Sequence, residues 1–372
     1  MRNIRREHRL VVYAILFFLI ICPTELIYKT ERFYYVISFA LLFFARFRDG
    51  FILKRDFSWS ILFYILYAAF TLLWSSFDGA ASILFAKLIA VSFLFLQLQC
   101  DYSVEEFEIF KTAIVIQYIF VLVLSLLFGY TAWDGRLWIV NGTLATDGNS
   151  ISAWLILPCC VFIERMMKKG SKLIERLICL ALLLSLFYLT YWTGSRAGIV
   201  AIVAAAVLSL LYTFRDTLRK NIVLSFVVLI VGAAIVFVGI RMLPDAVIQR
   251  FTYVNSNQLG GRTVVWRAMF DDLISNPLAF LFGFGESSTI GNRGVVAHCL
   301  YIEALYNQGL FGLLMIVYFM LKAFGRSLKN DHYIAIAFIG IAIVSASLSE
   351  FASRPVMLAF FFSAMNIKKV LE

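Results

Sequence analysis

The residues of this sequence that are best suited to chemistry are arginines beside tight, glycine-containing turns. Arg196 lies within the segment Thr193–Gly198, which reads Thr-Gly-Ser-Arg-Ala-Gly, and Arg262 directly follows two glycines. A guanidinium group is planar, stays charged at working pH and presents paired donors that match phosphate oxygens. Several of them in one external cleft would bind a phosphate or diphosphate without a metal ion. Three secondary candidates complete this set: Arg267, Arg293 and Arg354.

Each arginine also has an ordinary structural alternative. It would pair with a lipid headgroup or with a carboxylate of the same region. The carboxylates available for such pairing are Asp245, Asp271, Asp272, Glu286 and Glu350. We favour the binding role for Arg196, because a short connection between two apolar helices restricts where its side chain lies, and for Arg262, which follows two glycines.

His298 is the candidate for proton transfer. The chain has three histidines. His8 lies in a basic tail, and the helices predicted below place His332 on the side of the membrane opposite to His298. Histidine titrates nearest to neutrality, so it accepts a proton from a hydroxyl and releases it again within one turnover. A lone histidine at a helix start is also compatible with a cap or an interfacial residue, so the assignment depends on its neighbours.

The composition decides what kind of protein positions these residues. Of 372 residues, 62% are hydrophobic and 15% are charged, and the mean hydropathy is +0.87. Soluble domains average about half apolar and about a quarter charged residues, so this chain has too few charges to cover a soluble fold. We predict an all-α, polytopic integral membrane protein. The same figures argue against a disordered chain, a disulfide scaffold and a nucleic-acid-binding domain.

The hydropathy pattern predicts about twelve transmembrane helices, since about twenty apolar residues cross a bilayer. The second and the last are short. The predicted spans are residues 11–27, 33–45, 57–74, 81–99, 112–129, 150–167, 177–192, 197–214, 222–240, 303–324, 333–349 and 355–367.

The net charge of +10 has a topological explanation. Lysines and arginines concentrate on the side that holds both termini, and the positive-inside rule assigns that side to the cytoplasm. The candidate arginines and His298 then lie on the opposite face, whereas Lys87 lies inside a span. No nucleic-acid partner is needed to explain the charge. Because the six cysteines lack metal-ligand spacing and no carboxylate pair stands out, we expect no metal and no cofactor.

Two external connections are longer than the rest. The chain divides into nine predicted helices over residues 1–240, a large loop over 241–297 and three helices over 298–372, with a smaller loop at 130–149. A loop of more than about fifteen residues is usually functional or disordered, and the large loop is apolar enough to fold. Within it, residues 264–275 have the pattern of an amphipathic helix that ends at an Asn-Pro pair.

These features together resemble the bacterial O-antigen ligase and O-antigen polymerase superfamily. The resemblance is strongest over residues 190–355. It rests on Thr193–Gly198, on Leu-Gly-Gly-Arg-Thr-Val-Val-Trp at 259–266, on the Asn-Pro pair, and on His298 followed by Gly309 and Gly312. The family's ligase motif has Asn, Ser or Gln after the histidine, and here Cys299 replaces it. Arg250 and Gly261 also resemble an arginine-to-glycine spacing of some polymerases.

The resemblance implies an inverting, metal-independent glycosyltransferase of the inner membrane. Its donor would be an undecaprenyl-diphosphate-linked glycan on the periplasmic face, its acceptor another glycan or lipid A-core, and a chain-length regulator is a candidate partner. Arg196 and Arg262 would hold the diphosphate, and His298 would take the proton of the acceptor hydroxyl.

Three functions remain open at this level. An O-antigen polymerase is favoured slightly over a lipid A-core ligase, because the chain is of modest length, is rich in aromatic residues and departs from the ligase motif at Cys299. A polytopic transporter or flippase is a third possibility. Transporters concentrate ionisable residues near the bilayer midplane, whereas the polar residues of this chain are mostly external.

Overall fold

The computed structural model describes residues 9–27, 31–49, 55–132, 135–141, 144–220, 262–348 and 354–368. The predicted span at 222–240 and the candidate Arg250 lie outside these residues. The α-helices are α1 (Arg9–Ile21), α2 (Glu31–Asp49), α3 (Arg55–Phe70), α4 (Ala80–Leu98), α5 (Val104–Phe128), α6 (Gly148–Met167), α7 (Leu173–Thr193), α8 (Arg196–Lys220), α11 (Arg262–Ser275), α12 (Pro277–Phe282), α13 (Ser288–Arg293), α14 (Leu300–Asn330), α15 (His332–Val344) and α16 (Arg354–Ala364).

Short elements complete the fold. The 3₁₀ helices are η2 (Cys22–Leu26), η3 (Thr71–Trp74) and η4 (Ser345–Ser347). The strands are β1 (Asp101–Ser103), β2 (Gly129–Thr131), β3 (Leu137–Asn141), β4 (Leu144–Thr146) and β5 (Asn366–Lys368).

The helices support an all-α membrane protein. Within the described residues, six helices are long and apolar enough to cross a membrane, namely α4, α5, α6, α7, most of α8, and α14. The remaining predicted spans in this part of the chain coincide with shorter apolar helices, some extended by a 3₁₀ turn. The total of twelve spans stays a prediction.

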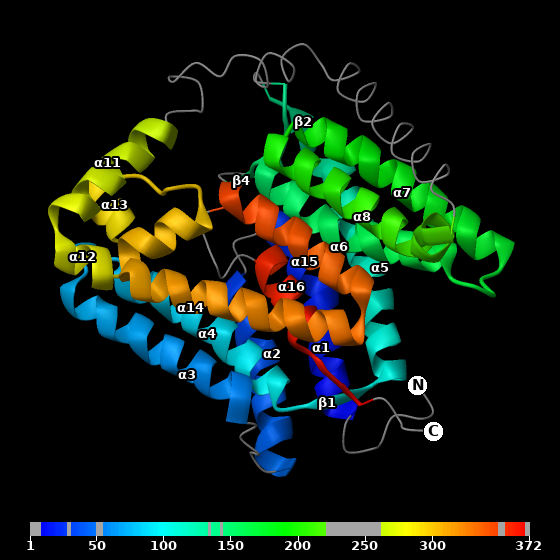
Figure 1. The fold of residues 1–372 in the computed structure, drawn as a ribbon, viewed down its shortest axis with the longest axis horizontal. Coiled ribbons are helices and arrows are strands. Elements are labelled where there is room, and N and C mark those ends of the chain that lie inside the picture. Colours follow the sequence, from blue (N-terminus) through cyan, green and yellow to red (C-terminus); the bar gives the residue numbers. More distant parts are fainter. Residues whose placement is uncertain are drawn as a thin grey trace.

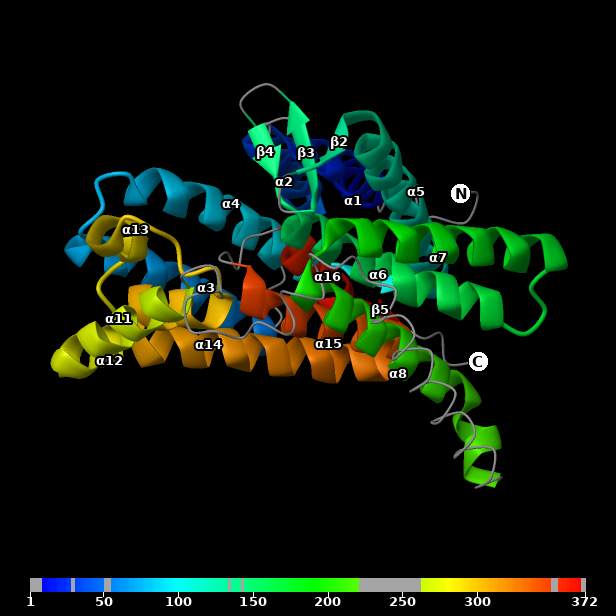
Figure 2. The same cartoon turned by 90° about the horizontal axis from the view of Figure 1, so that it is seen from above.

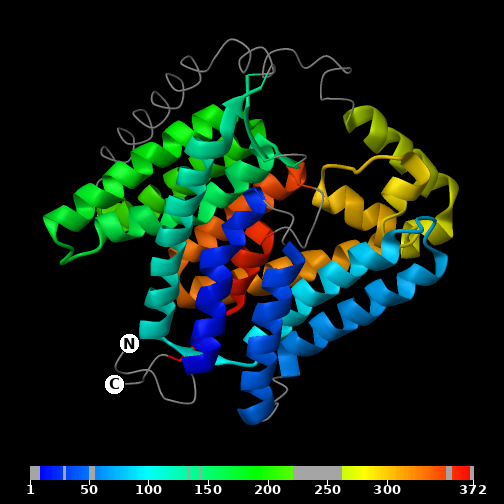
Figure 3. The ribbon, with the colours of Figure 1, turned by 180° about the vertical axis from the view of Figure 1, so that it is seen from behind.

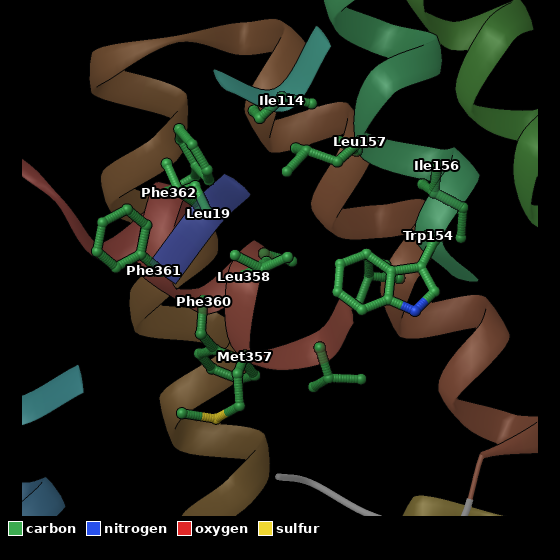
Figure 4. Close-up of a cluster of buried hydrophobic side chains, with 14 of the residues drawn as sticks. Leu19, Ile114, Trp154, Ile156, Leu157, Met357, Leu358, Phe360, Phe361 and Phe362 are labelled. Atoms are coloured by element: carbon green, nitrogen blue, oxygen red, sulfur yellow. The ribbon is translucent and has the colours of Figure 1, made fainter. Parts of the chain in front are cut away.

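The helix α16 occupies the middle of the bundle (Figure 1). Its residues from Pro355 to Ala364 are buried, because the helix is apolar on all sides and therefore needs neighbours all round it. Figure 4 shows Phe360, Phe361 and Phe362 of α16 together with Leu19 of α1 and Ile114 of α5. Seen from behind, α1, α2 and α5 form one face of the bundle (Figure 3).

Two small sheets were not predicted. In the smaller external loop, β2, β3 and β4 form an antiparallel sheet that projects from one edge of the bundle (Figure 2). Leu137 and Ile139 on alternate positions of β3 are fully buried, which is the spacing that a strand requires. A second sheet pairs β1 with β5 in parallel. The all-α prediction therefore holds for the bundle but omits these strands.

The region after Arg262 forms a compact group of helices, α11 to α13, at one end of the molecule beside α3 and α4 (Figures 1 and 2). The amphipathic helix predicted over 264–275 corresponds to α11. Asn276 ends it and caps α12, since its side-chain oxygen accepts a hydrogen bond of 3.1 Å from the backbone N–H of Ala279.

The helix α14 is interrupted at Gly309, whose backbone (φ 71°, ψ −174°) is not helical. Residues 300–308 are called its first segment and residues 310–330 its second. A Cβ atom on Gly309 would lie 2.3 Å from the carbonyl oxygen of Leu281. The two family-motif glycines thus have different roles, since Gly309 permits a break and Gly312 packs closely against Gln308.

Candidate active site

Arg196 is positioned by the tight connection between α7 and α8. Gly194 ends α7 in the left-handed conformation (φ 58°), and the Ser195 hydroxyl donates a hydrogen bond of 2.7 Å to Asn149 Oδ1 near the start of α6. A Cβ atom on Gly198 would lie 2.2 Å from Ser152 Oγ, so α8 approaches α6 closely. The motif therefore places Arg196 at the first position of α8, beside the N-terminal end of α6.

That end of α6 carries a carboxylate. Asp147 caps the helix, because its Oδ1 atom accepts a hydrogen bond of 3.0 Å from the backbone N–H of Ser150. Its Oδ2 atom accepts a hydrogen bond of 2.9 Å from the Asn149 side chain. Asp147 is thus held in place near Arg196.

Arg262 begins α11 and lies on the face that packs on the protein. Trp266, Met269 and Leu273 follow it at helical spacing, and the last two are fully buried. They pack with Leu305 and Tyr306 of the first segment of α14. This packing of α11 on the first segment of α14 places Arg262 near the N-terminal end of α14, where His298 lies.

His298 directly precedes Cys299, which is the N-cap residue of α14. Its backbone has a φ of 50°, a region that residues other than glycine rarely adopt. Both backbone polar groups of the preceding residue, Ala297, form hydrogen bonds with side chains. Its N–H donates a hydrogen bond of 2.9 Å to Glu303 Oε2, and its carbonyl oxygen accepts one of 2.7 Å from the indole N–H of Trp266.

The charges of these elements act on one another. Burial lowers the pKa of Arg262, Asp147 opposes this effect, and Arg136 and Arg196 lower the pKa further. The pKa of His298 lies below its ordinary value, chiefly because neighbouring protein removes water from the ring and also because Arg262 is close, while Asp147 acts in the opposite direction. The structure therefore brings the three main predicted residues, His298, Arg196 and Arg262, into one electrostatic group.

The group has an excess of positive charge around a histidine that favours its neutral form. Three arginines share it with one carboxylate, Asp147. Such an arrangement suits an anionic ligand with several oxygens, because each guanidinium group offers paired donors. A neutral imidazole beside the anion is able to accept a proton.

The secondary candidates are placed differently. Arg293 on α13 forms an ion pair with Asp272 of α11, with an Nε to Oδ2 distance of 2.9 Å, and this raises the pKa of Arg293. The carboxylate alternative therefore applies to Arg293. Arg267 is exposed on α11, and Arg354 begins α16.

Glu286 does not pair with an external arginine. It is fully buried between α12 and α13, and its Oε1 atom lies 2.6 Å from the Nζ atom of Lys87 on α4. Gln308 donates a further hydrogen bond of 3.0 Å to its Oε2 atom. These partners hold the pKa of Glu286 below its ordinary value despite burial. The intramembrane cation Lys87 is thus explained by a structural ion pair.

Sequence reasoning missed Arg136, Asp147 and Glu303. Arg136 lies directly before β3 in the smaller loop, where nothing in its local sequence singles it out. Asp147 precedes a helix as N-cap residues do, which was a usable signal. Glu303 falls five residues after His298 in an apolar helix, and such a buried carboxylate indicates a specific partner.

Residues 180–317 match the family model described as O-antigen ligase. Over this region the chain is similar to the O-antigen polymerase and ligase superfamily. The matched region contains Arg196, Arg262 and His298. Together with the apolar helices, the match supports a multi-pass membrane protein of lipopolysaccharide biosynthesis that acts, in broad terms, as a polymerase or ligase of lipid-linked glycans. No curated protein sequence is significantly similar to this chain.

Proposed function

We propose that this protein is a metal-independent, inverting glycosyltransferase that polymerises undecaprenyl-diphosphate-linked O-antigen repeat units. The observation that carries the proposal is the grouping of Arg196 and Arg262 with a histidine whose pKa is lowered. The distribution of basic residues supports an inner-membrane location with both termini in the cytoplasm and the site on the periplasmic face. A chain-length regulator is a candidate partner.

In the proposed reaction, neutral His298 accepts the proton of an acceptor hydroxyl. The hydroxyl oxygen attacks the anomeric carbon of the donor sugar from the face opposite the diphosphate, which inverts the configuration. The bond between this carbon and the diphosphate oxygen breaks, and the leaving diphosphate keeps the electron pair. Arg196 and Arg262 stabilise the charge that develops on it. The products are a longer glycan and undecaprenyl diphosphate.

A lipid A-core ligase is the second candidate, since the matching family model is described as O-antigen ligase. Its donor chemistry would be the same, so the same arginines and histidine would serve it. The two candidates differ only in the acceptor.

The test is a lipopolysaccharide gel from a strain that lacks the gene, probed with antiserum to the surface glycan. Core carrying a single repeat unit indicates the polymerase, whereas core without any repeat, with long glycan left on the lipid carrier, indicates the ligase. A normal ladder of glycan lengths would contradict both.

Complementation then tests the catalytic assignment. We expect His298→Ala to restore only residual glycan transfer, about a hundredfold or more below that of the unaltered protein, although the variant reaches the membrane in normal amount. His332→Ala is the matched control, because His332 is exposed at the start of α15, where its ring stacks on Tyr212 with centroids 4.5 Å apart. Full activity of the His298 variant would remove this residue from the mechanism.

A further inference from the structure

The backbone of Ala297, the residue before His298, is held by two side chains from different elements. Trp266 of α11 donates its indole N–H to the carbonyl oxygen of Ala297 at 2.7 Å, and Glu303 of α14 accepts the N–H of Ala297 at 2.9 Å. Ala297 itself is buried. Its position is therefore determined from both sides of the chain.

Glu303 is itself fixed in place. Only 7% of the residue is exposed, and its Oε1 atom accepts a hydrogen bond of 2.8 Å from the hydroxyl of Thr289 and a longer one of 3.4 Å from the Asn307 side chain. Asn307 in turn accepts a bond of 3.0 Å from the backbone N–H of Thr289. A buried carboxylate with this number of donors has little freedom to move.

The backbone of His298 explains why such restraint is needed. Its φ of 50° is unfavourable for a residue with a Cβ atom, so the surrounding structure has to hold it there. Hydrogen bonds to the N–H and the carbonyl oxygen of Ala297 are well placed to do this, because they restrain the two peptide units through which the chain enters residue 298.

The same contacts connect the histidine to an arginine. Trp266 lies four residues after Arg262, so the two side chains share one face of α11. Met269 and Leu273 continue this face and pack on the first segment of α14. A single rigid connection therefore runs from Arg262 through Trp266 to Ala297 and His298.

We propose that Glu303 and Trp266 are positioning residues that hold the backbone N–H and carbonyl of Ala297 and so orient His298 toward the diphosphate-binding arginines. The proposal rests on the proposed function of His298. Neither residue has to touch the substrate, and both act through the backbone. An effect on catalysis, with donor binding largely unchanged, is the expected signature.

Steady-state kinetics of the full-length protein in proteoliposomes test this, with a polyprenyl-diphosphate-linked glycan as donor. Glu303→Gln keeps an oxygen acceptor for Thr289 and Asn307 but replaces the oxygen that accepts the N–H of Ala297 with an amide NH₂ group. Trp266→Phe keeps an aromatic ring but loses the indole N–H that bonds the carbonyl oxygen of Ala297. We expect kcat to fall at least about tenfold in each variant while KM for the donor changes less than about threefold, since small misplacements of a catalytic group reduce the rate strongly. The matched control is Trp74→Phe, which removes an indole hydrogen bond of 3.1 Å to Gly283, away from residue 297.

A double-mutant cycle separates positioning from general damage. If Glu303 acts through His298, adding Glu303→Gln to His298→Ala lowers kcat no further than His298→Ala alone. Independent, multiplying effects would overturn the proposal. Unchanged kcat in both Glu303→Gln and Trp266→Phe would overturn it as well.

A second measurement does not depend on activity. The chain has three histidines, so ¹⁵N-histidine labelling gives few ring signals, and the His298 signals are assigned by their loss in His298→Ala. We expect Glu303→Gln to shift these signals and to leave those of His8 and His332 in place. Unshifted His298 signals would contradict the positioning role. Shifted signals in a protein without transferase activity would contradict only the proposed function.

Discussion

His298 accepts a proton only in its neutral form, and its surroundings favour that form. Partial removal of water from the ring lowers its pKa, and the nearby positive charge of Arg262 lowers it further. Asp147 acts in the opposite direction, because its negative charge raises the pKa of His298 and also that of Arg262. At the residue scale, one carboxylate therefore raises the pKa of both the proposed base, His298, and the proposed anion-binding Arg262.

The pH dependence of activity follows from this balance. Activity should rise with pH through the lowered pKa of His298, so the acidic limb of kcat/KM should lie below the ordinary histidine value of about 6.5. Asp147→Asn keeps a capping oxygen but removes the negative charge, so we expect the limb to move to lower pH. Asp78→Asn, at an exposed position before α4, should leave the limb unchanged. A limb that moves upward in Asp147→Asn would refute the assignment.

At the scale of elements, the break in α14 at Gly309 is stabilised by hydrogen bonds to the carbonyl groups that it frees. A break in a helix frees carbonyl oxygens, which are costly to leave without donors inside a membrane protein. Here the backbone N–H groups of Phe284 and Gly285 donate to Tyr306 and Asn307 at 2.9 Å each, and the Tyr67 hydroxyl donates to Gln308 at 2.7 Å. The break lets the first segment carry His298 to the site.

Gly309 should tolerate no side chain. Gly309→Ala would place Cβ 2.3 Å from a backbone oxygen and would force alanine into a conformation that is almost restricted to glycine. We expect a loss of about 2 kcal/mol or more, seen as a lower melting temperature of the purified protein in detergent. Gly325→Ala in the second segment is the control, because nothing lies within 4 Å of a Cβ there, and it should stabilise the helix by up to about 1 kcal/mol. Equal melting temperatures of the two variants would count against this account.

At the scale of the whole molecule, a buried ion cluster joins the helices α5, α6 and α15. The Nζ atom of Lys111 on α5 lies 2.6 Å from Glu164 of α6, 2.9 Å from Asp331 before α15 and 2.8 Å from Glu108. Lys111 is only 2% exposed. The single cation therefore holds together carboxylates that would otherwise repel one another.

Removing this cation should weaken the bundle as a whole. Lys111→Met leaves the mostly buried carboxylates of Glu164 and Asp331 without their cation, which costs about 3 to 5 kcal/mol in comparable sites. We expect a marked fall in melting temperature in detergent, measured by tryptophan fluorescence. Lys169→Met changes an exposed lysine in the turn after α6 and should have little effect. A Lys111 variant as stable as the Lys169 variant would show that the cluster contributes nothing to stability.

Much of the helix pattern and part of the site could be predicted because they depend on local properties. Apolar runs of membrane length mark helices in any context, and α11 shows its period and its Asn-Pro end within the local sequence. The Arg196 turn was visible in the sequence because glycine is favoured at the left-handed position of residue 194 and at the close helix contact of residue 198. The short strands β2 to β4 were missed, because three to five residues carry little pattern of their own.

The sequence by itself indicated a helical membrane protein, a resemblance to the O-antigen polymerase and ligase superfamily, and His298, Arg196 and Arg262 as candidates, since composition, period and motif spacing are properties of the chain alone. The tertiary structure decided which charges meet. Arg293 pairs with Asp272, Lys87 with Glu286, and Arg136 and Asp147 act on Arg262. These partners come from separate elements that only packing brings together, and charge interactions depend on distance in space and on burial.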